Sequence, residues 1–229
     1  MIPVLTIDGP SGSGKGAVSR RVADRLGWHL LDSGALYRLV ALSAVRAGVD
    51  LNDRVALTGI ATELAARFDS DDQGNERIWL EGEEVTGEVR TEKCGELASQ
   101  VARVPDVRIA LMALQHGYQA PPGLVADGRD MGTVVFPDAP LKIFLMASPE
   151  ERAKRRHKQL KDKGIGVSLS ALSRDIAERD ARDANRSVAP LLPAADARTL
   201  DSTDLTIDEV VAQIAAWAED TFGAADDSR

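Results

Sequence analysis

The run Gly9-Pro10-Ser11-Gly12-Ser13-Gly14-Lys15-Gly16 has the composition and spacing of a phosphate-binding loop. Its glycines allow the backbone to turn so that successive N–H groups point at phosphate oxygens, beside the positive end of a following helix. Lys15 adds a mobile positive charge for the β- and γ-phosphates of a nucleotide. The simpler alternative is a glycine-rich turn with a surface lysine.

The residues on either side of the loop distinguish these two interpretations. Val4–Asp8 is a short apolar and β-branched run that predicts a buried strand. After the loop, Val18, Val22 and Leu26 recur every four residues, as they would on one face of a helix. Strand, glycine loop and helix in this order form the context of a Walker A motif, so we expect the loop to bind a nucleoside triphosphate.

The loop departs from the common pattern directly after its lysine. Most P-loops place Ser or Thr there, and its hydroxyl contacts Mg²⁺, whereas this chain has Gly16 and then Ala17. The metal would then be held by water, by phosphates and by another oxygen ligand. This favours a kinase of small molecules over a GTPase or a motor ATPase, because two bound phosphates can supply much of the metal's coordination shell.

The composition is that of an ordinary soluble globular protein, with 229 residues, of which 44% are apolar and 28% charged. Cys94 is the single cysteine and the three histidines are dispersed, so we expect no zinc or iron–sulfur site and no disulfide framework. We assign Cys94 no role. A reducing cytoplasm fits this cysteine usage, and nothing before Val4 resembles a signal peptide.

Charge and hydropathy argue against two kinds of partner. The net charge of −8 disfavours non-specific binding of nucleic acid. No apolar run approaches the roughly 20 residues needed to cross a bilayer, so we expect no membrane partner. Because the substrates of a P-loop are polyanions, the arginines must be concentrated locally.

Apolar segments alternate with helical ones, which predicts an α/β fold with a parallel sheet flanked by helices. The five expected strands are Val4–Asp8, Trp28–Leu31, Gly123–Ala126, Leu141–Met146 and Thr199–Leu200 with its neighbours. Capping boxes are expected where Ser148 precedes Glu151 and where Thr206 precedes Glu209. The last helix has an apolar stripe made of Ile207, Val210, Val211, Ile214 and Trp217.

Residues from about Phe68 to Val89 interrupt this alternation. Ser70–Asn75 is acidic and rich in turn formers, and Arg77–Leu80 and Glu84–Val85 flank Glu81-Gly82-Glu83, which predicts a β-hairpin. We therefore expect a lobe at residues 51–104, inserted into a single domain whose core comprises residues 1–50, 105–150 and 187–223.

Three polar clusters follow the expected strands and helices, and ligands of open α/β sheets lie beyond the carboxyl ends of the strands. In Asp32–Arg38, either Asp32 or Ser33 can cap a helix that carries Arg38. In Asp127–Gly132, Asp127 is either a Walker B acid that supports Mg²⁺ or a turn former. Arg129 and Asp130 either pair with each other or clamp a phosphate and read the amino group of a base.

In the third cluster, Arg179, Arg182 and Arg186 share one helical face. Ion pairs with Asp175, Glu178 and Asp183 could explain the pattern, at about 0.3–0.5 kcal/mol each. Beside a P-loop we favour a role in phosphoryl transfer, which needs several positive groups. The basic run Arg152–Lys158 faces either the nucleotide phosphates or solvent, and it lacks the interleaved aromatic residues of a nucleic-acid patch.

Together, Gly9–Gly16, Leu31–Arg38, Asp127–Pro137 and Arg179–Arg186 resemble the bacterial cytidylate kinase family, one of the nucleoside monophosphate kinases. The resemblance covers nearly the whole chain, including the inserted lobe. It implies the P-loop nucleoside monophosphate kinase fold and transfer of the γ-phosphoryl group of ATP to CMP or dCMP. UMP, dTMP, shikimate and coenzyme precursors remain alternative acceptors, and a P-loop switch protein is the alternative of another class, although the chain lacks an Asn-Lys-x-Asp motif.

The resemblance also implies roles for individual residues. Arg38, Arg129 and Arg186 would grip the CMP phosphate, Ser33, Arg179 and Asp183 would hold its ribose side, and Ser99, Arg108 and Asp130 would read the cytosine. Lys15, Arg129, Arg179 and Arg186 would act in catalysis. We further expect residues 154–186 to form a lid and the protein to be a monomer. Thr is common in the family at the position of Ala17, so a minor contact to the phosphates is in doubt.

Overall fold

The computed structural model describes residues 2–73, 76–162, 164, 166–184 and 189–223, which group into two units. Unit 1 comprises Met1–Leu31 and Gly117–Arg229, and unit 2 comprises Asp32–His116. Unit 2 therefore contains the expected lobe at residues 51–104 together with residues on both sides of it.

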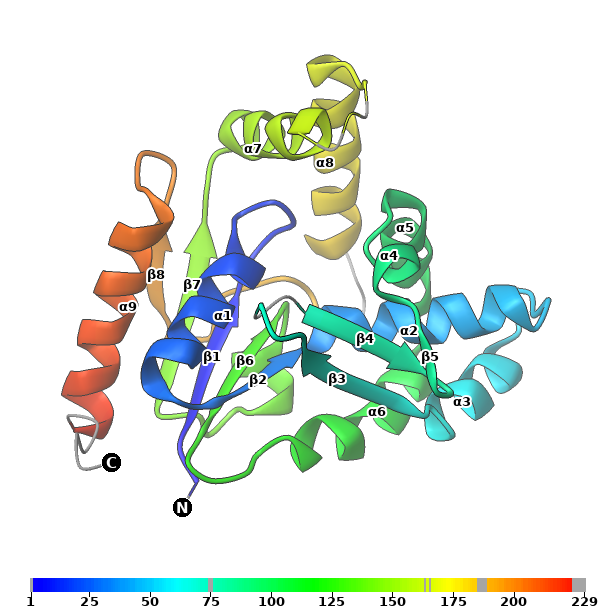
Figure 1. The fold of residues 1–229 in the computed structure, drawn as a ribbon, viewed down its shortest axis with the longest axis horizontal. Helices are drawn as coiled ribbons and strands as arrows, with labels where there is room; N and C mark the ends of the chain where they lie inside the picture. Colours follow the sequence, from blue (N-terminus) through cyan, green and yellow to red (C-terminus); the bar gives the residue numbers. More distant parts are fainter. Residues whose placement is uncertain (1, 74–75, 163, 165, 185–188, 224–229) are drawn as a thin grey trace. The chain divides into compact units, whose positions relative to one another are not determined.

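Unit 1 is built on a five-stranded parallel sheet with the order β2-β6-β1-β7-β8 (Figure 1). The strands are β1 (Val4–Asp8), β2 (His29–Asp32), β6 (Leu124–Gly128), β7 (Leu141–Met146) and β8 (Arg198–Asp201). All five residues of β1 are buried, because the strand lies in the middle of the sheet and both of its faces are covered. The five predicted strands are thus confirmed, with ends shifted by one or two residues.

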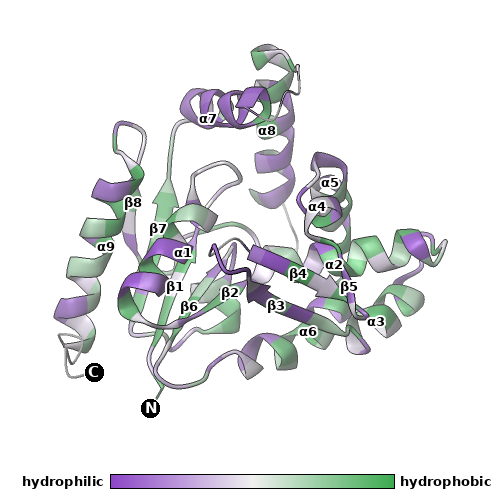
Figure 2. Cartoon of the chain, viewed as in Figure 1, coloured by the Kyte–Doolittle hydropathy of each residue, from purple (hydrophilic) through white to green (hydrophobic). Residues whose placement is uncertain are grey.

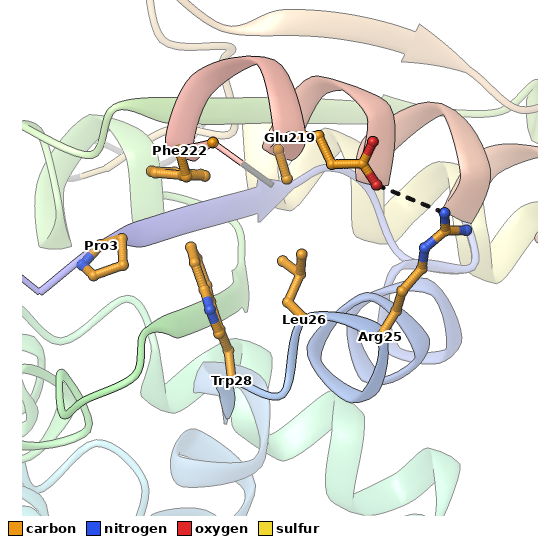
Figure 3. A pocket seen from close by; sticks show the side chains of 8 residues that line it. Pro3, Arg25, Leu26, Trp28, Glu219 and Phe222 are labelled. Atoms are coloured by element: carbon orange, nitrogen blue, oxygen red, sulfur yellow. Dashed lines mark ion pairs between the residues drawn. The ribbon is translucent and has the colours of Figure 1, made fainter. Parts of the chain in front are cut away.

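Two helices of unit 1, α1 (Lys15–Leu26) and α9 (Ile207–Phe222), bury their apolar faces against the sheet. The buried residues of this core are Leu5, Ile7, Val18, Val22, Ala23, Val125, Leu141, Ile143, Leu145, Val210, Val211, Ile214 and Ala218. At its edge Trp28 packs edge-on against Phe222, with ring centroids 5.0 Å apart. Both rings line a surface hollow at the C-terminal ends of α1 and α9 (Figure 3).

The remaining helices of unit 1 are α7 (Pro149–Asp162), α8 (Leu169–Ala184) and the single-turn π-helix η1 (Met131–Val135). Figure 2 shows that α7 and α8 are mostly hydrophilic, whereas β7 is hydrophobic. Each of the two helices buries little apolar surface: Ala153 and Leu160 on α7, and Leu172 and Ile176 on α8. Polar contacts therefore contribute much of what holds α7 and α8 in place in unit 1.

Unit 2 contains an antiparallel sheet of β3 (Ala66–Ser70), β4 (Glu76–Leu80) and β5 (Glu83–Glu84). Its helices are α2 (Ser33–Arg46), α3 (Arg54–Thr62), α4 (Thr86–Val89), α5 (Glu92–Val101) and α6, which runs from Pro105 to Gly117. The predicted hairpin is confirmed as β4 and β5. Strand β3 was not predicted, because only Ala66 and Phe68 face the core and five residues of alternation beside an acidic turn give a weak signal.

The two expected capping boxes have different outcomes. Thr206 and Glu209 form a complete one at the start of α9. At α7 the Ser148 hydroxyl accepts a hydrogen bond from the Glu151 N–H (3.2 Å), but the Ser148 N–H donates to Thr203 Oγ1 (2.9 Å). The expected box at Ser148 is therefore only half formed. Of the apolar stripe of α9, Val210, Val211 and Ile214 are buried, whereas Ile207 at the start of the helix is 41% exposed.

Within the described ranges, the helices are all too short or too polar to pass through a bilayer.

Candidate functional site

The glycine loop joins β1 to α1 and depends on backbone conformations that favour glycine. Gly9, Gly12 and Gly14 have φ values of 151°, 78° and 93°. A Cβ atom on Gly9 would lie 2.1 Å from the carbonyl oxygen of Leu145, so any side chain there would collide with β7. The loop therefore passes directly over the end of the neighbouring strand β7, and the predicted order of strand, loop and helix is confirmed.

Helix α1 begins at Lys15 without a side-chain cap. Gly14 stands at the cap position, has no side chain to accept a hydrogen bond, and no acidic residue occupies the first turn. The first N–H groups of an α-helix have no intrahelical partners and carry a partial positive charge. An anion such as a phosphate can bind at this end of α1.

Lys15 is buried at the same place. Its Nζ donates a hydrogen bond to the Pro10 carbonyl (2.8 Å), and the residue is 6% exposed. Burial, as the largest cause, and the positive charges of Arg129 and Arg179 together lower the pKa of Lys15 to about 7, against the opposing effect of Asp127. Three cationic side chains from distant parts of the sequence therefore act on one region of unit 1.

Arg129 is held by α8. Its Nε donates to Asp183 Oδ2 (3.3 Å) and its Nη1 donates to the carbonyl of Gly128 (3.2 Å). Asp183 is 1% exposed, so this ion pair is largely shielded from water. The pair brings together two residues that the sequence assigned to different motifs.

Asp8, which the sequence analysis did not select, holds the loop that carries Arg129 and Asp130. Its two carboxylate oxygens accept hydrogen bonds from the N–H groups of Met131 (2.9 Å) and Gly132 (2.8 Å). Burial raises the pKa of Asp8 to about 6, although these two hydrogen bonds oppose the shift. The available signal was an acidic residue at the end of an otherwise apolar strand.

Asp127 lies on β6 and is paired in register with Ile7 on β1. It is 7% exposed, and a Cβ atom on Gly16 would lie 3.6 Å from its Oδ2. A buried carboxylate beside the start of α1 has the position and the chemistry of a Walker B acid. These residues fit a hard cation bound together with a nucleotide's phosphates.

Two arginines of α7 donate hydrogen bonds to backbone carbonyls of the glycine loop. Arg152 Nη1 donates to the Ser11 carbonyl (3.0 Å), and Arg155 Nη1 donates to the Ser13 carbonyl (3.3 Å). Lys154 is exposed, so the helix turns only part of its basic surface to solvent. When the N–H groups of such a loop point inward at an anion, its carbonyls point outward, and two guanidinium groups neutralise them here. The sequence pattern had left this orientation open.

In unit 2 the Asp32 side chain caps α2 by accepting a hydrogen bond from the Ala35 N–H (3.0 Å). Asp32 also pairs with Arg90 at 2.8 Å. Burial alone would raise the pKa of Asp32, but the positive charge of Arg90 holds it below its ordinary value. This ionised cap places Ser33 at the first position of the helix and Arg38 in its second turn.

Arg38 is fixed by backbone carbonyls far away in the sequence. Its Nη1 donates to Val89 (2.6 Å) and Thr91 (2.9 Å). A Cβ atom on Gly95 would lie 2.6 Å from Arg38 Nη2, so a side chain there would displace the guanidinium from this position. Gly95 was not selected from the sequence, because the need for it arises from a contact with residue 38.

Ser99 and Arg108 are both buried in unit 2, at 4% and 5% exposure. Among the described residues, the Ser99 hydroxyl has no hydrogen-bond partner. The Arg108 guanidinium lies 5.8 Å from the ring centroid of Tyr37. A buried hydroxyl that lacks a partner is costly unless a ligand or water supplies one.

The structure thus brings together Lys15, Arg129, Arg179 and Asp183 in unit 1, and it places Ser33, Arg38, Ser99 and Arg108 within unit 2. Arg186, an expected catalytic and CMP-binding residue, lies outside the described residues. The hollow at Trp28 lies at the opposite end of α1 from Lys15, about 16 Å away at 1.5 Å per residue, and is distinct from this site.

A P-loop at the end of β1, a buried acid on β6 and several cations directed at the loop define a P-loop kinase of small molecules. A family model described as "Cytidylate kinase" matches residues 5–220. The chain is 60% identical over 214 residues to the cytidylate kinase of Pseudomonas paraeruginosa, covering 93% of each chain. It is 56% identical over 216 residues to that of Colwellia psychrerythraea, covering 94% of this chain and 96% of the relative. The chain belongs to the cytidylate kinase family and is a phosphotransferase, which confirms the resemblance.

Proposed function

We propose that this protein transfers the γ-phosphoryl group of ATP to CMP or dCMP, which yields ADP and CDP or dCDP. The observation that carries the proposal is the convergence of charge on the glycine loop: Arg129 and Arg179 both act on the buried Lys15. Family membership supplies the identity of the acceptor. Such a cluster of cations suits a transferring phosphoryl group, whose charge is spread over its equatorial oxygens.

The chain needs no dedicated general base for this reaction, because the phosphate of CMP is already an anionic nucleophile near neutral pH. The backbone of Gly9–Gly16 and the start of α1 bind the phosphates of ATP, and Lys15 reaches the transferring group. Arg129 and Arg179 neutralise developing charge, and Arg186 belongs to the same proposed set. The work of the protein is alignment, charge neutralisation and exclusion of water.

Mg²⁺ belongs to the proposal as the partner of ATP. When bound it would neutralise negative charge on the phosphates of ATP. Asp127 is the residue proposed to support it, through water, since Gly16 and Ala17 offer no hydroxyl. The buried carboxylate beside Gly16 supports this assignment.

The acceptor set is proposed residue by residue from the family. Arg38, Arg129 and Arg186 bind the phosphate of CMP, and Ser33, Arg179 and Asp183 hold the ribose side. Ser99, Arg108 and Asp130 contact the base. The carbonyl-anchored guanidinium of Arg38 and the partnerless hydroxyl of Ser99 are what one expects of groups kept ready for a ligand.

A panel of acceptors tests the function. ADP release would be measured with ATP and each of CMP, dCMP, UMP, dTMP and shikimate. We expect CMP or dCMP to be preferred by about tenfold or more over UMP, since a buried polar group left without its partner costs about 1–3 kcal/mol. Preference for UMP would overturn the cytosine assignment, and ATP turnover that is independent of any acceptor would favour a switch protein.

Substitution of Asp130 by alanine is expected to weaken discrimination rather than turnover. A carboxylate can accept a hydrogen bond from the exocyclic amine of cytosine, whereas uracil presents a carbonyl there. The ratio of kcat/KM for CMP to that for UMP should fall by about tenfold, the effect of roughly 1.4 kcal/mol. An unchanged ratio, with normal kcat for CMP, would remove Asp130 from the base-reading set.

The affinity for ATP is expected to fall as the pH rises above about 7. Because burial lowers the pKa of Lys15 to about 7, the side chain is increasingly neutral above that pH, and binding a triphosphate must restore its proton. The dissociation constant should therefore rise by up to about tenfold per pH unit, measured calorimetrically from about pH 7 to pH 9 without acceptor. Lys15→Arg, which stays charged throughout, should show a flatter profile. A flat wild-type profile would contradict the prediction.

The proposal also includes a monomer that acts in the cytoplasm and a lid at residues 154–186 that closes over the nucleotides. Sedimentation at several concentrations would test the monomer. Comparison of amide exchange across residues 154–162 and 169–184, with and without both nucleotides, would test the lid.

A further inference from the structure

We infer that Asp180 and Arg152 position helix α8 for phosphoryl transfer by tying it to the outer side of the glycine loop. This inference rests on the proposed kinase function. It concerns two residues for which neither the motifs nor the proposed substrate contacts supply a role.

The ion pair between the two side chains is bidentate. Arg152 Nη1 donates to Asp180 Oδ1 (3.0 Å), and Arg152 Nη2 donates to Asp180 Oδ2. The Arg152 side chain is 4% exposed and that of Asp180 is 28% exposed. A guanidinium and a carboxylate joined in this way restrict each other's orientation as well as their distance.

The same guanidinium binds two further segments of unit 1. Its Nη1 also donates to the Ser11 carbonyl in the glycine loop (3.0 Å), and its Nε donates to the carbonyl of Ala147, which follows β7 (3.0 Å). All three nitrogens of Arg152 are therefore used. One side chain joins the phosphate loop, the end of a sheet strand and α8.

Helix α8 carries groups of the proposed reaction on both sides of this anchor. Arg179 directly precedes Asp180, and Asp183 follows it by one turn and pairs with Arg129. Arg129 and Asp183 are themselves proposed to bind CMP, so their contacts change when the acceptor arrives. Asp180 and Arg152 are not proposed to bind CMP, so their ion pair can hold the helix in place throughout the reaction.

A contribution to the stability of the fold does not by itself explain this ion pair. Removing two charges from water costs nearly as much as their attraction returns, so a buried pair contributes little net stability compared with apolar residues. Its specific effect is geometric. The pair sets the distance between the glycine loop and Arg179, whose positive charge acts on Lys15 in that loop.

Asp180→Asn is the direct test, because it keeps the size of the side chain and removes the charge and one acceptor. We expect kcat to fall roughly tenfold to a hundredfold, the effect of a displacement of about 1 Å in aligned groups. The KM for ATP should change by less than about threefold, because Arg152 keeps its contacts to Ser11 and Ala147. Asp175→Asn is the matched control: it makes the same change on an exposed position of α8 and should leave kcat unaltered.

Conservative variants separate positioning from folding. Asp180→Glu retains the carboxylate and should recover most of the lost kcat, which a variant that merely disturbed packing would not do. If thermal unfolding shows that Asp180→Asn is not folded, Arg152→Lys takes its place, since a lysine keeps the charge but cannot form the bidentate pair. A normal kcat in the folded variant, an equal loss in Asp175→Asn, or no recovery in Asp180→Glu would overturn the inference. Failure of the wild-type protein to phosphorylate CMP would instead overturn the proposed function.

Discussion

Replacing Arg129 with alanine is expected to lower kcat with CMP and ATP by a hundredfold or more. Arg129 acts on Lys15 from the loop after β6, which places its charge where the transferring phosphoryl group would be neutralised. Removal of one preorganised charge partner of a transition state typically costs about a hundredfold to a thousandfold. Steady-state rates at saturating CMP and ATP would measure this loss.

The same substitution removes the Arg129 partner of the buried Asp183, so a loss of stability has to be separated from a loss of catalysis. A buried charge deprived of its partner costs roughly 3–5 kcal/mol. The double variant R129A/D183N also removes the buried negative charge and should recover most of the stability in chemical denaturation, but none of the kcat. Arg174→Ala is the control on an exposed position of α8, and it should behave as wild type. A double variant that regained activity along with stability would show that Arg129 acts only on the fold.

The parts of the fold that the sequence predicted are those that depend on neighbouring residues. Glycines at positions 9, 12 and 14 were recognisable because a phosphate loop needs them between a strand and a helix, and their φ values confirm that need. The cap of α9 was predicted for the same reason, since Thr206 and Glu209 satisfy each other within one turn. Periodicity likewise identified the faces of α1 and α9 that meet the sheet.

The parts that could not be predicted depend on partners distant in sequence. A basic helix at residues 149–162 has the same pattern whether its arginines face solvent or the carbonyls of Ser11 and Ser13. A side chain at Gly95 would press on the Arg38 guanidinium, and nothing at residues 92–101 reveals that neighbour. Asp8 was missed for a related reason, because its two N–H donors lie more than a hundred residues away, at Met131 and Gly132.

Gly9→Ala is expected to abolish ATP binding and to destabilise the protein by at least about 4 kcal/mol, a cost reached by few single substitutions. The new Cβ atom would lie 2.1 Å from the Leu145 carbonyl oxygen, and 3.1 Å from its carbon. Neither atom belongs to a flexible side chain that could move aside. Urea denaturation and equilibrium binding of ATP would measure the two effects.

The alternative explanation is that a positive φ at Gly9 makes any substitution costly regardless of the space available. Gly27 distinguishes the two, because it has a φ of 64° at the end of α1 and no atom within 4 Å of an added Cβ. Gly27→Ala should therefore cost only the conformational strain, about 1–2 kcal/mol, and should bind ATP normally. If Gly9→Ala were no more damaging than Gly27→Ala, β1 and β7 would have room to separate at the loop. The position of the phosphate site would then not be set by the contact between Gly9 and Leu145.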